Sequence, residues 1–171
     1  FRYVACKSNY YIAPTNKDKH GKELWNHHKM VKRTMYVYDG VEGGKTGYTT
    51  KAGGTLVTFA KRGDQELIVV DLCAHGYELY EDTIKMLNYG FNNYKTIAPF
   101  KTMEMVLQDD EYGFLTTGNK LSPYKIPLNH LKDVTVMLEK NQPASNLTYK
   151  CKGSKYTVSY NGKQIGSVKL K

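Results

Sequence analysis

Residues 43–53 read GGKTGYTTKAG, a stretch whose residue types are suited to binding an anion. Lys45 supplies a positive charge, and the hydroxyl of Thr46 beside it can donate a hydrogen bond to a carboxylate or a phosphate. The glycines would let a ligand lie close to the main chain. Three interpretations are open for this stretch: a nucleotide-binding loop, a plain hairpin, and one part of a catalytic cleft.

The spacing argues against a nucleotide-binding loop. The P-loop pattern G-x-x-x-x-G-K-[ST] has four residues between its glycines and is followed directly by a helix. Gly40 and Gly44 have only three residues between them, so the loop is one residue short. Three more glycines follow up to Gly54, which is a poor start for a helix. The run 55–60 after them is strand-like.

The residues around this stretch predict mainly strands and loops. We expect a strand with a turn after it over 1–12, a solvated loop over 17–22, a short helix within Leu24–Met35, and a loop over Gly40–Gly54. The expected strand at the start ends before Pro14. The candidate anion-binding residues would therefore lie in a loop.

A hairpin and one long helix are predicted next. Thr55–Lys61 and Glu66–Leu72 are expected to pair around the turn 62–65. The Arg-Gly-Asp triplet in this turn is explained by the needs of a tight turn, so it does not indicate cell adhesion. Residues 77–95 are predicted to be helical, because apolar side chains recur there at helical spacing and would face the core. These side chains are Tyr80, Ile84, Leu87, Phe91 and Tyr94.

The remaining residues predict a separate β-rich domain. Few helix signals occur after Lys95, and Asn161-Gly162 is a strong hairpin signal between the last two strands. We therefore expect two domains, 1–95 and 96–171. The strands expected in the second are Phe100–Leu107, Val134–Glu139, Leu147–Lys152, Tyr156–Tyr160 and Gln164–Leu170.

Composition and charge limit the class of protein. The chain is 40% hydrophobic and 24% charged, which indicates a folded globular protein. Its net charge of +9 is spread evenly, which argues against a nucleic-acid partner. Such a field would favour encounter with polyanions such as cell-wall polymers, but a soluble protein with many surface lysines is the simpler interpretation. The three cysteines form no C-x-x-C pair, so we expect no structural zinc. Cys73 follows an apolar run and is expected to be a buried core thiol.

A longer pattern surrounds Lys45-Thr46-Gly47. The box K-T-G-Y-T is followed by Ala52-Gly53, then by the predicted hairpin, and then by a helix that ends in Tyr89-Gly90-Phe91. With the upstream stretch YYIAPTNKDKHGKELWNHHKMV, this pattern resembles the later half of a serine D-alanyl-D-alanine carboxypeptidase, a low-molecular-weight penicillin-binding protein. The likeness runs over about residues 8–95.

The resemblance implies an α+β fold: part of a penicillin-binding/β-lactamase-like antiparallel sheet with a C-terminal helix, followed by a small all-β domain. The family's KTG box lies on the edge strand of the sheet, along one wall of the active site. By position, Lys45 would supply positive charge, Thr46 would hydrogen-bond the substrate carboxylate, and Gly47 would leave room for the substrate. The main-chain N–H of Tyr48 would be one donor of the oxyanion hole. His27 and His28 are interpreted as polar residues at a helix end.

Two further motifs of the family do not precede this box. The family's nucleophile belongs to an S-x-x-K motif, and an S-x-N motif completes its cleft. Ser8 is the only serine before Lys45 and fits neither motif. Ser122–Lys125 and Ser159–Asn161 match the two patterns later in the chain, but Pro127 would disrupt a helix that starts at Ser122. The second match falls at a hairpin turn. We therefore expect the 171 residues to be the C-terminal portion of an enzyme and to be inactive alone.

One further residue of the family has no counterpart at this place in the sequence. Family members often carry an arginine just before the long helix that helps to bind the substrate carboxylate. Here residues 74–79 read AHGYEL, with no arginine.

The resemblance implies a bacterial hydrolase of peptidoglycan biosynthesis and cell shape, exported to the outer face of the cell membrane. It would use neither a metal nor an organic cofactor. Its partners would be peptidoglycan stem peptides and β-lactam antibiotics, together with a missing N-terminal segment or a swapped second chain. The alternative hypothesis is a non-catalytic module that binds the cell wall or a protein through its basic, tyrosine-rich surface.

Overall fold

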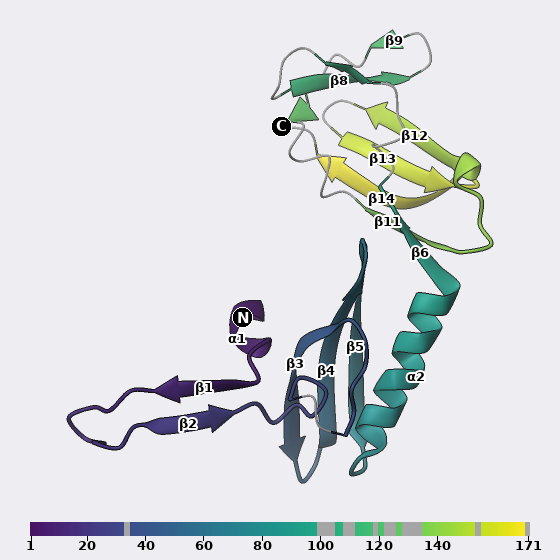
Figure 1. Cartoon of the computed structure of the whole chain (residues 1–171). Helices are drawn as coiled ribbons and strands as arrows, with labels where there is room; N and C mark the ends of the chain where they lie inside the picture. The colour runs from purple at the N-terminus through teal and green to yellow at the C-terminus, as the bar shows by residue number, and fades with distance from the viewer. Residues whose placement is uncertain are drawn as a thin grey trace. The chain divides into compact units, whose positions relative to one another are not determined.

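The computed structural model describes residues 1–32, 35–98, 105–107, 112–117, 120–121, 126–127, 135–152 and 155–169. It divides into two compact units, Phe1–Asn93 and Tyr94–Lys171 (Figure 1). In the described residues the strands pair antiparallel and a single long helix occurs, so the α+β class predicted from the sequence is confirmed.

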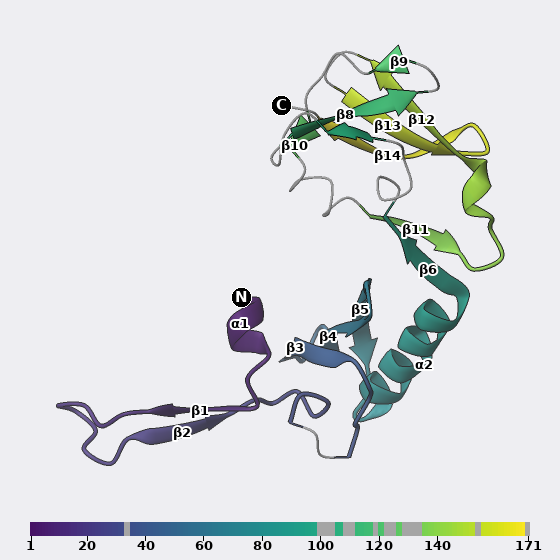
Figure 2. The same cartoon turned by 45° about the horizontal axis from the view of Figure 1, so that its top comes forward.

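The first unit contains a two-stranded hairpin and a three-stranded sheet. Its elements are α1 (Arg2–Ala5), β1 (Asn9–Ile12), β2 (Lys22–Trp25), β3 (Val41–Thr49), β4 (Gly53–Arg62), β5 (Gln65–Ala74) and α2 (Glu78–Asn93). Strands β1 and β2 pair with each other and form a ribbon that extends away from the sheet β3-β4-β5 (Figures 1 and 2). Strand β4 is the central strand of that sheet, so among the described strands β3 has a partner on one side only.

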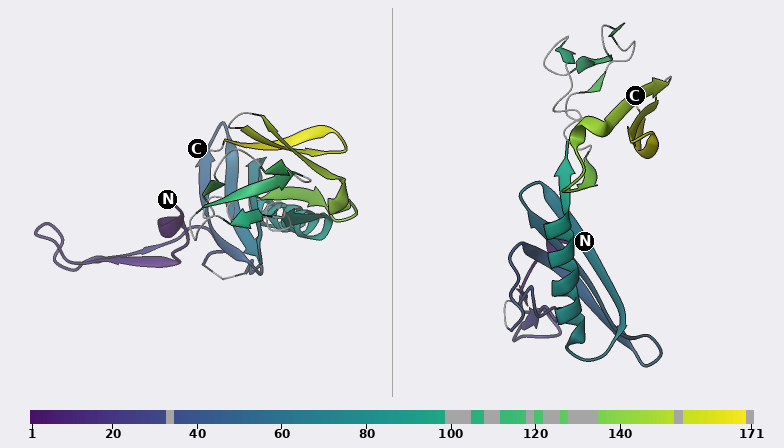
Figure 3. Two further views of the ribbon diagram at one scale, coloured as in Figure 1. Left: turned by 90° about the horizontal axis from the view of Figure 1, so that it is seen from above. Right: turned by 90° about the vertical axis from the view of Figure 1, so that its right-hand side faces the viewer.

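Helix α2 covers one face of the sheet and forms the core with it (Figure 3). Leu87 and Phe91 of α2 pack against Ala60 of β4 and Val69 of β5. The predicted apolar stripe is therefore confirmed within the helix, and its last member, Tyr94, lies in the strand that follows. The predicted hairpin is also confirmed, since β4 and β5 pair from Arg62 and Gln65 onwards.

Three local expectations in the first unit are wrong. Residues 2–5 form a helix instead of a strand, and the described part of 24–35 contains no helix. The glycine-rich stretch expected to be a loop forms strand β3. Two of these segments are ordered by antiparallel pairing with the adjacent strand along the chain: β2 pairs with β1, and β3 pairs with β4.

Cys73 is exposed, so the expectation of a buried core thiol is wrong. Gly54 pairs with Ala74 and Thr55 pairs with Leu72, which leaves Cys73 as an extra residue without a cross-strand partner. Such a residue is a β-bulge. The φ angle of 63° at Cys73 places it in the left-handed region, and its side chain leaves the face that its sequence position predicts.

The second unit consists of short antiparallel strands. They are β6 (Tyr94–Ile97), β7 (Met105–Leu107), β8 (Tyr112–Thr117), β9 (Lys120–Leu121), β10 (Ile126–Pro127), β11 (Val136–Glu139), β12 (Leu147–Lys152), β13 (Lys155–Tyr160) and β14 (Lys163–Lys169). A 3₁₀ turn at Ala144–Asn146 precedes β12. Strands β12, β13 and β14 form one sheet, and β11 pairs with β6. The core side chains are Val136, Leu138, Leu147 and Val158.

Four of the expected strands of this unit are confirmed, with bounds that shift by two residues at most. Of Phe100–Leu107, residues 100–104 lie outside the described residues and 105–107 form β7. Asn161 and Gly162 both have positive φ, at 48° and 78°. Two such residues form the hairpin turn that the sequence predicted, because glycine and asparagine tolerate this region.

Truncation of Leu87 should destabilise the first unit strongly. Leu87 is fully buried against the sheet, so Leu87→Ala leaves a cavity and should lower the free energy of unfolding by about 2–5 kcal/mol. Met86 precedes it on the same helix and is 39% exposed, so Met86→Ala is the matched control and should have a far smaller effect. Urea unfolding followed by circular dichroism at 222 nm measures both variants. Equal losses would contradict this orientation of α2.

Candidate active site

Strand β3 places the four predicted site residues in a row on one edge of the sheet. Lys45 pairs with Val57, Thr46 with Leu56, Gly47 with Thr55, and Tyr48 with Gly54 of strand β4. Side chains alternate between the two faces of a strand, so Lys45 and Thr46 leave β3 on opposite faces, but both line the same cavity at the edge of the sheet. The structure thus brings these residues together on one strand instead of in a loop.

Gly44 lets β3 approach its neighbours more closely than any other residue could. A Cβ atom at this position would lie 2.1 Å from the main-chain oxygen of Val57 and 2.6 Å from Cδ2 of His28. Gly47 is similarly confined, since a Cβ there would lie 2.5 Å from Oγ1 of Thr55. The glycines on either side of Lys45-Thr46 therefore serve close packing within the first unit.

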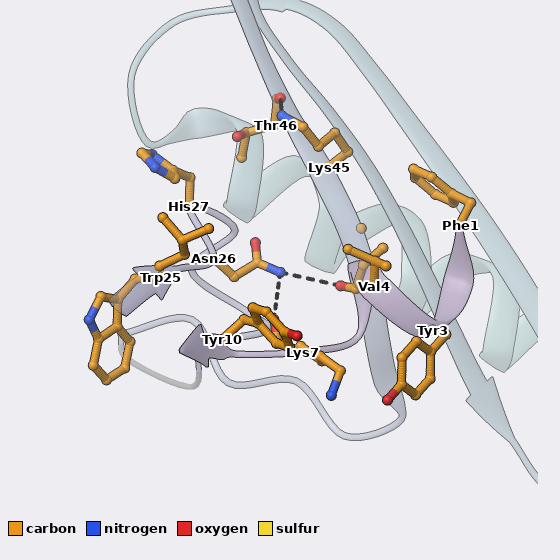
Figure 4. A pocket seen from close by; sticks show the side chains of 13 residues that line it. Phe1, Tyr3, Val4, Lys7, Tyr10, Trp25, Asn26, His27, Lys45 and Thr46 are labelled. Carbon is orange, nitrogen blue, oxygen red and sulfur yellow. Dashed lines mark hydrogen bonds between the residues drawn. The ribbon is translucent and has the colours of Figure 1, made fainter. Parts of the chain in front are cut away.

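A cavity of about 610 Å³ lies along this edge of β3 (Figure 4). Its walls come from α1, from the β1–β2 hairpin and the residues after it, and from β3, and they are mostly apolar and aromatic. The lining residues are Phe1, Tyr3, Val4, Ala5, Lys7, Tyr10, Leu24, Trp25, Asn26, His27, Gly44, Lys45 and Thr46. Lys45 and Thr46 line the cavity, whereas Gly47 and Tyr48 lie farther along the strand.

The side chains of Lys45 and Tyr48 are accessible to a ligand. Lys45 is exposed, and its Nζ donates a hydrogen bond to the main-chain carbonyl of Thr46. The Tyr48 residue is 76% exposed. An exposed ammonium beside a hydroxyl, at the mouth of an apolar cavity, is chemically suited to bind a carboxylate attached to an apolar or peptide group.

Asn26 links two walls of the cavity, the chain after α1 and the segment after β2, by hydrogen bonds. Its Nδ2 donates hydrogen bonds to the main-chain oxygens of Ala5 at 3.3 Å and Lys7 at 3.0 Å, and its main-chain N–H donates to Ser8 at 2.8 Å (Figure 4). Its Oδ1 accepts a hydrogen bond from the main-chain N–H of His28 at 2.9 Å. Sequence reasoning gave Asn26 no role, because a single asparagine carries no recognisable signal.

His28 is fully buried, so its interpretation as a polar residue at a helix end is wrong. Its Nε2 lies 2.8 Å from Oγ1 of Thr58, and its ring meets the ring of Tyr80 edge-on at 5.9 Å. Burial lowers the pKa of His28 from 6.5 to about 4, and the main-chain carbonyls of His28 and Val57 offset this only in part. The ring is therefore neutral at pH 7. Its neighbour His27 is exposed and lines the cavity.

The two serine motifs found later in the chain belong to the second half of the sequence. Ser122–Lys125 lies outside the described residues. Ser159 and Tyr160 end strand β13, and Asn161 forms the turn after it, so this S-x-N match is part of a hairpin in the second unit. Among the described residues, no group of three His, Cys, Asp or Glu side chains is placed to hold a metal ion. No helix in the described part of the chain is both long and apolar enough to cross a membrane.

Comparison with known proteins supports the resemblance that the KTG pattern indicated. No family model matches the chain. It is 40% identical over 62 residues to the D-alanyl-D-alanine carboxypeptidase DacC of Escherichia coli strain K12, a match that covers 36% of this chain and 16% of that protein. The chain resembles the C-terminal portion of a D-alanyl-D-alanine carboxypeptidase. The resemblance stated from the KTG pattern is therefore confirmed.

The fold is similar to those of solved penicillin-binding proteins. Penicillin binding protein 5 from Haemophilus influenzae matches at 20% identity with a TM-score of 0.57, and penicillin binding protein 6B from Escherichia coli matches at 18% identity with a TM-score of 0.55. Each match covers 99% of this chain, but only 49% and 43% of the solved chains. The chain therefore spans less than half of the length of these structures.

Acid should destabilise the first unit through His28. An unfolded histidine has a pKa near 6.5 and His28 has one of about 4, so the unfolded state binds the proton more readily between these values. Lowering the pH from about 6.5 to about 4 should therefore reduce the free energy of unfolding, by roughly 3 kcal/mol in total. His28→Gln should remove this part of the pH dependence, as measured by urea unfolding at several pH values. His27→Gln is the matched control at an exposed position, and an equal effect of both variants would contradict the prediction.

Proposed function

We propose that this chain is the carboxylate-binding part of a serine-type D-alanyl-D-alanine carboxypeptidase. The complete enzyme would remove the terminal D-alanine from peptidoglycan stem peptides through a serine acyl-enzyme and would bind β-lactams, at the outer face of the bacterial cell membrane. The observation that carries the proposal is the position of Lys45 and Thr46 on the edge strand β3, where both line a cavity. The sequence identity to DacC supports it.

The roles of the four residues follow from the chemistry of the substrate. A stem peptide ends in a carboxylate, which Lys45 would attract by its charge and Thr46 would bind through its hydroxyl. Gly47 would let the peptide lie close to the main chain of the strand, next to Oγ1 of Thr55, which lies 2.5 Å from where a Cβ of residue 47 would stand. The main-chain N–H of Tyr48 would stabilise the oxyanion that forms during acyl transfer, a contribution of about 3 kcal/mol per donor in other enzymes.

The nucleophile and its base would come from polypeptide outside these 171 residues. The exposed face of the sheet supports this view, because Ile68, Val70 and Leu72 of β5 are 72%, 53% and 68% exposed there. Val57 and Phe59 of β4 pair with Val70 and Ile68 and so share this face. An apolar sheet face is normally covered by a second layer. That layer would be a missing N-terminal segment or a segment of a second, swapped chain.

The alternative function, a non-catalytic interaction module, rests on the edge of the same sheet. Strand β5 has one partner, β4, among the described strands, and its other edge is free to pair with a strand of another chain. Capture of a partner without any acyl transfer would fit this alternative. A requirement for Lys45 in penicillin acylation by a complete cleft would separate the two functions.

The 171-residue chain alone should not react with a fluorescent penicillin. It holds the proposed carboxylate-binding wall but no S-x-x-K serine before the KTG box. Intact mass measured after incubation with the label should equal that of the unmodified 19.5 kDa chain. Covalent label on the chain would contradict the absence of a nucleophile and would direct attention to Ser122.

A chimera tests the proposed role of Lys45. Residues 1–95 of this chain would replace the matching part of penicillin binding protein 5 from Haemophilus influenzae, which supplies the rest of the cleft. Lys45→Ala in this chimera should lower the rate of penicillin acylation by a factor of about 100 or more, because a charge-assisted contact to the carboxylate is lost. Lys51→Ala, at an exposed lysine beyond the end of β3, is the matched control. An active Lys45→Ala chimera would contradict the proposal.

A further inference from the structure

The ring of His28 contacts the cross-strand pair Gly44–Thr58 of the sheet. Gly44 of β3 and Thr58 of β4 are direct partners, and His28 hydrogen-bonds to the Thr58 hydroxyl at 2.8 Å. The missing side chain of Gly44 is what makes room for the ring, since a Cβ there would lie 2.6 Å from Cδ2 and 2.7 Å from Nε2 of His28. His28 and Thr58 are both fully buried. The ring therefore contacts both strands one residue before Lys45.

The segment that carries His28 is itself held on two sides. On one side, the main-chain N–H of His28 bonds to Asn26, which is bonded in turn to the chain after α1. On the other side, the main-chain N–H of Lys29 donates to the Tyr80 hydroxyl of α2 at 3.3 Å, and the His28 ring contacts the Tyr80 ring. The imidazole is thus fixed between the sheet and α2.

We propose that His28 is a positioning residue, which holds strand β3 at Gly44 and so sets the position of Lys45 and Thr46. In the described part of the chain, strand β3 is bonded to another strand on one side only, and glycines at 43 and 44 give it little side-chain packing of its own. Glycine in a strand leaves the backbone free to shift. The imidazole takes the place of the missing side chain and fixes Gly44 against β4. Thr46 follows two residues later on the same face as Gly44.

The catalytic consequence of this role rests on the proposed function, but the positioning itself does not. A shift of β3 would move both the ammonium of Lys45 and the hydroxyl of Thr46 relative to the cavity that they line. Substrate-binding groups lose efficiency when they are displaced by about 1 Å. His28 would act through Gly44 and Thr58, without touching the substrate.

Hydrogen exchange measured by NMR on the whole 171-residue chain tests the positioning. His28→Leu keeps a buried apolar side chain but removes the hydrogen bond, and Thr58→Val removes the hydroxyl at nearly constant volume. Both should speed the exchange of the protected amides of Gly43–Gly47 by at least fivefold, whereas those of α2 should change by less than twofold. His28→Gln can still bond to Thr58 through its side-chain amide and should keep the exchange of Gly43–Gly47 within twofold of the original chain.

Two results would overturn the proposal. The first is unchanged exchange at Gly43–Gly47 in His28→Leu and Thr58→Val. The second is an equal increase over β3, β4, β5 and α2, which would mean that His28 only adds to global stability. Neither readout requires catalysis, so a failure here is distinct from a failure of the Lys45 chimera, which concerns the proposed function.

Discussion

The pairing of β3 with β4 is the constraint on which the arrangement of the first unit depends. A strand that reads Val-Glu-Gly-Gly-Lys-Thr-Gly has few apolar side chains with which to hold itself in place. Its order comes from the ladder to β4 and from close contacts that only glycine permits, above all at Gly44. Because β4 lies between β3 and β5, the same ladder leaves Lys45 and Thr46 at an edge, where a ligand can reach them.

The two faces of this sheet have different surroundings. On one face, Leu56, Thr58 and Ala60 of β4 are buried, under α2 and His28. On the other face, Ile68, Val70 and Leu72 of β5 remain exposed. A sheet with two apolar faces is typical of a layer inside a larger domain. This asymmetry accords with a chain that spans less than half of the solved penicillin-binding proteins it resembles.

Local signals in the sequence predicted those elements whose conformation is decided locally. The apolar period of 3.6 residues predicted α2, and Asn161-Gly162 predicted the last hairpin, because each signal acts within a few residues. Strand β3 was predicted to be a loop, since glycine disfavours strands, and its order comes from the ladder to β4 that a count of glycines does not reveal. No sequence pattern shows that an imidazole fills the space beside Gly44, or that a bulge turns Cys73 outwards. The family motif nevertheless identified the candidate residues, because it records types and spacing without reference to conformation.

The electrostatics of Lys45 predict that the cavity edge by itself binds a carboxylate weakly. In this structure its ammonium is exposed and bonds to the carbonyl of Thr46 on its own strand. An ion pair at 4 Å gains about 1 kcal/mol in bulk water but about 4 kcal/mol at an effective dielectric constant near 20. Covering the apolar cavity would exclude water and strengthen the attraction of Lys45 for a carboxylate. In the proposed enzyme, the polypeptide that supplies the nucleophile would also strengthen the site to which the substrate binds, so substrate binding and acyl transfer would both depend on that polypeptide.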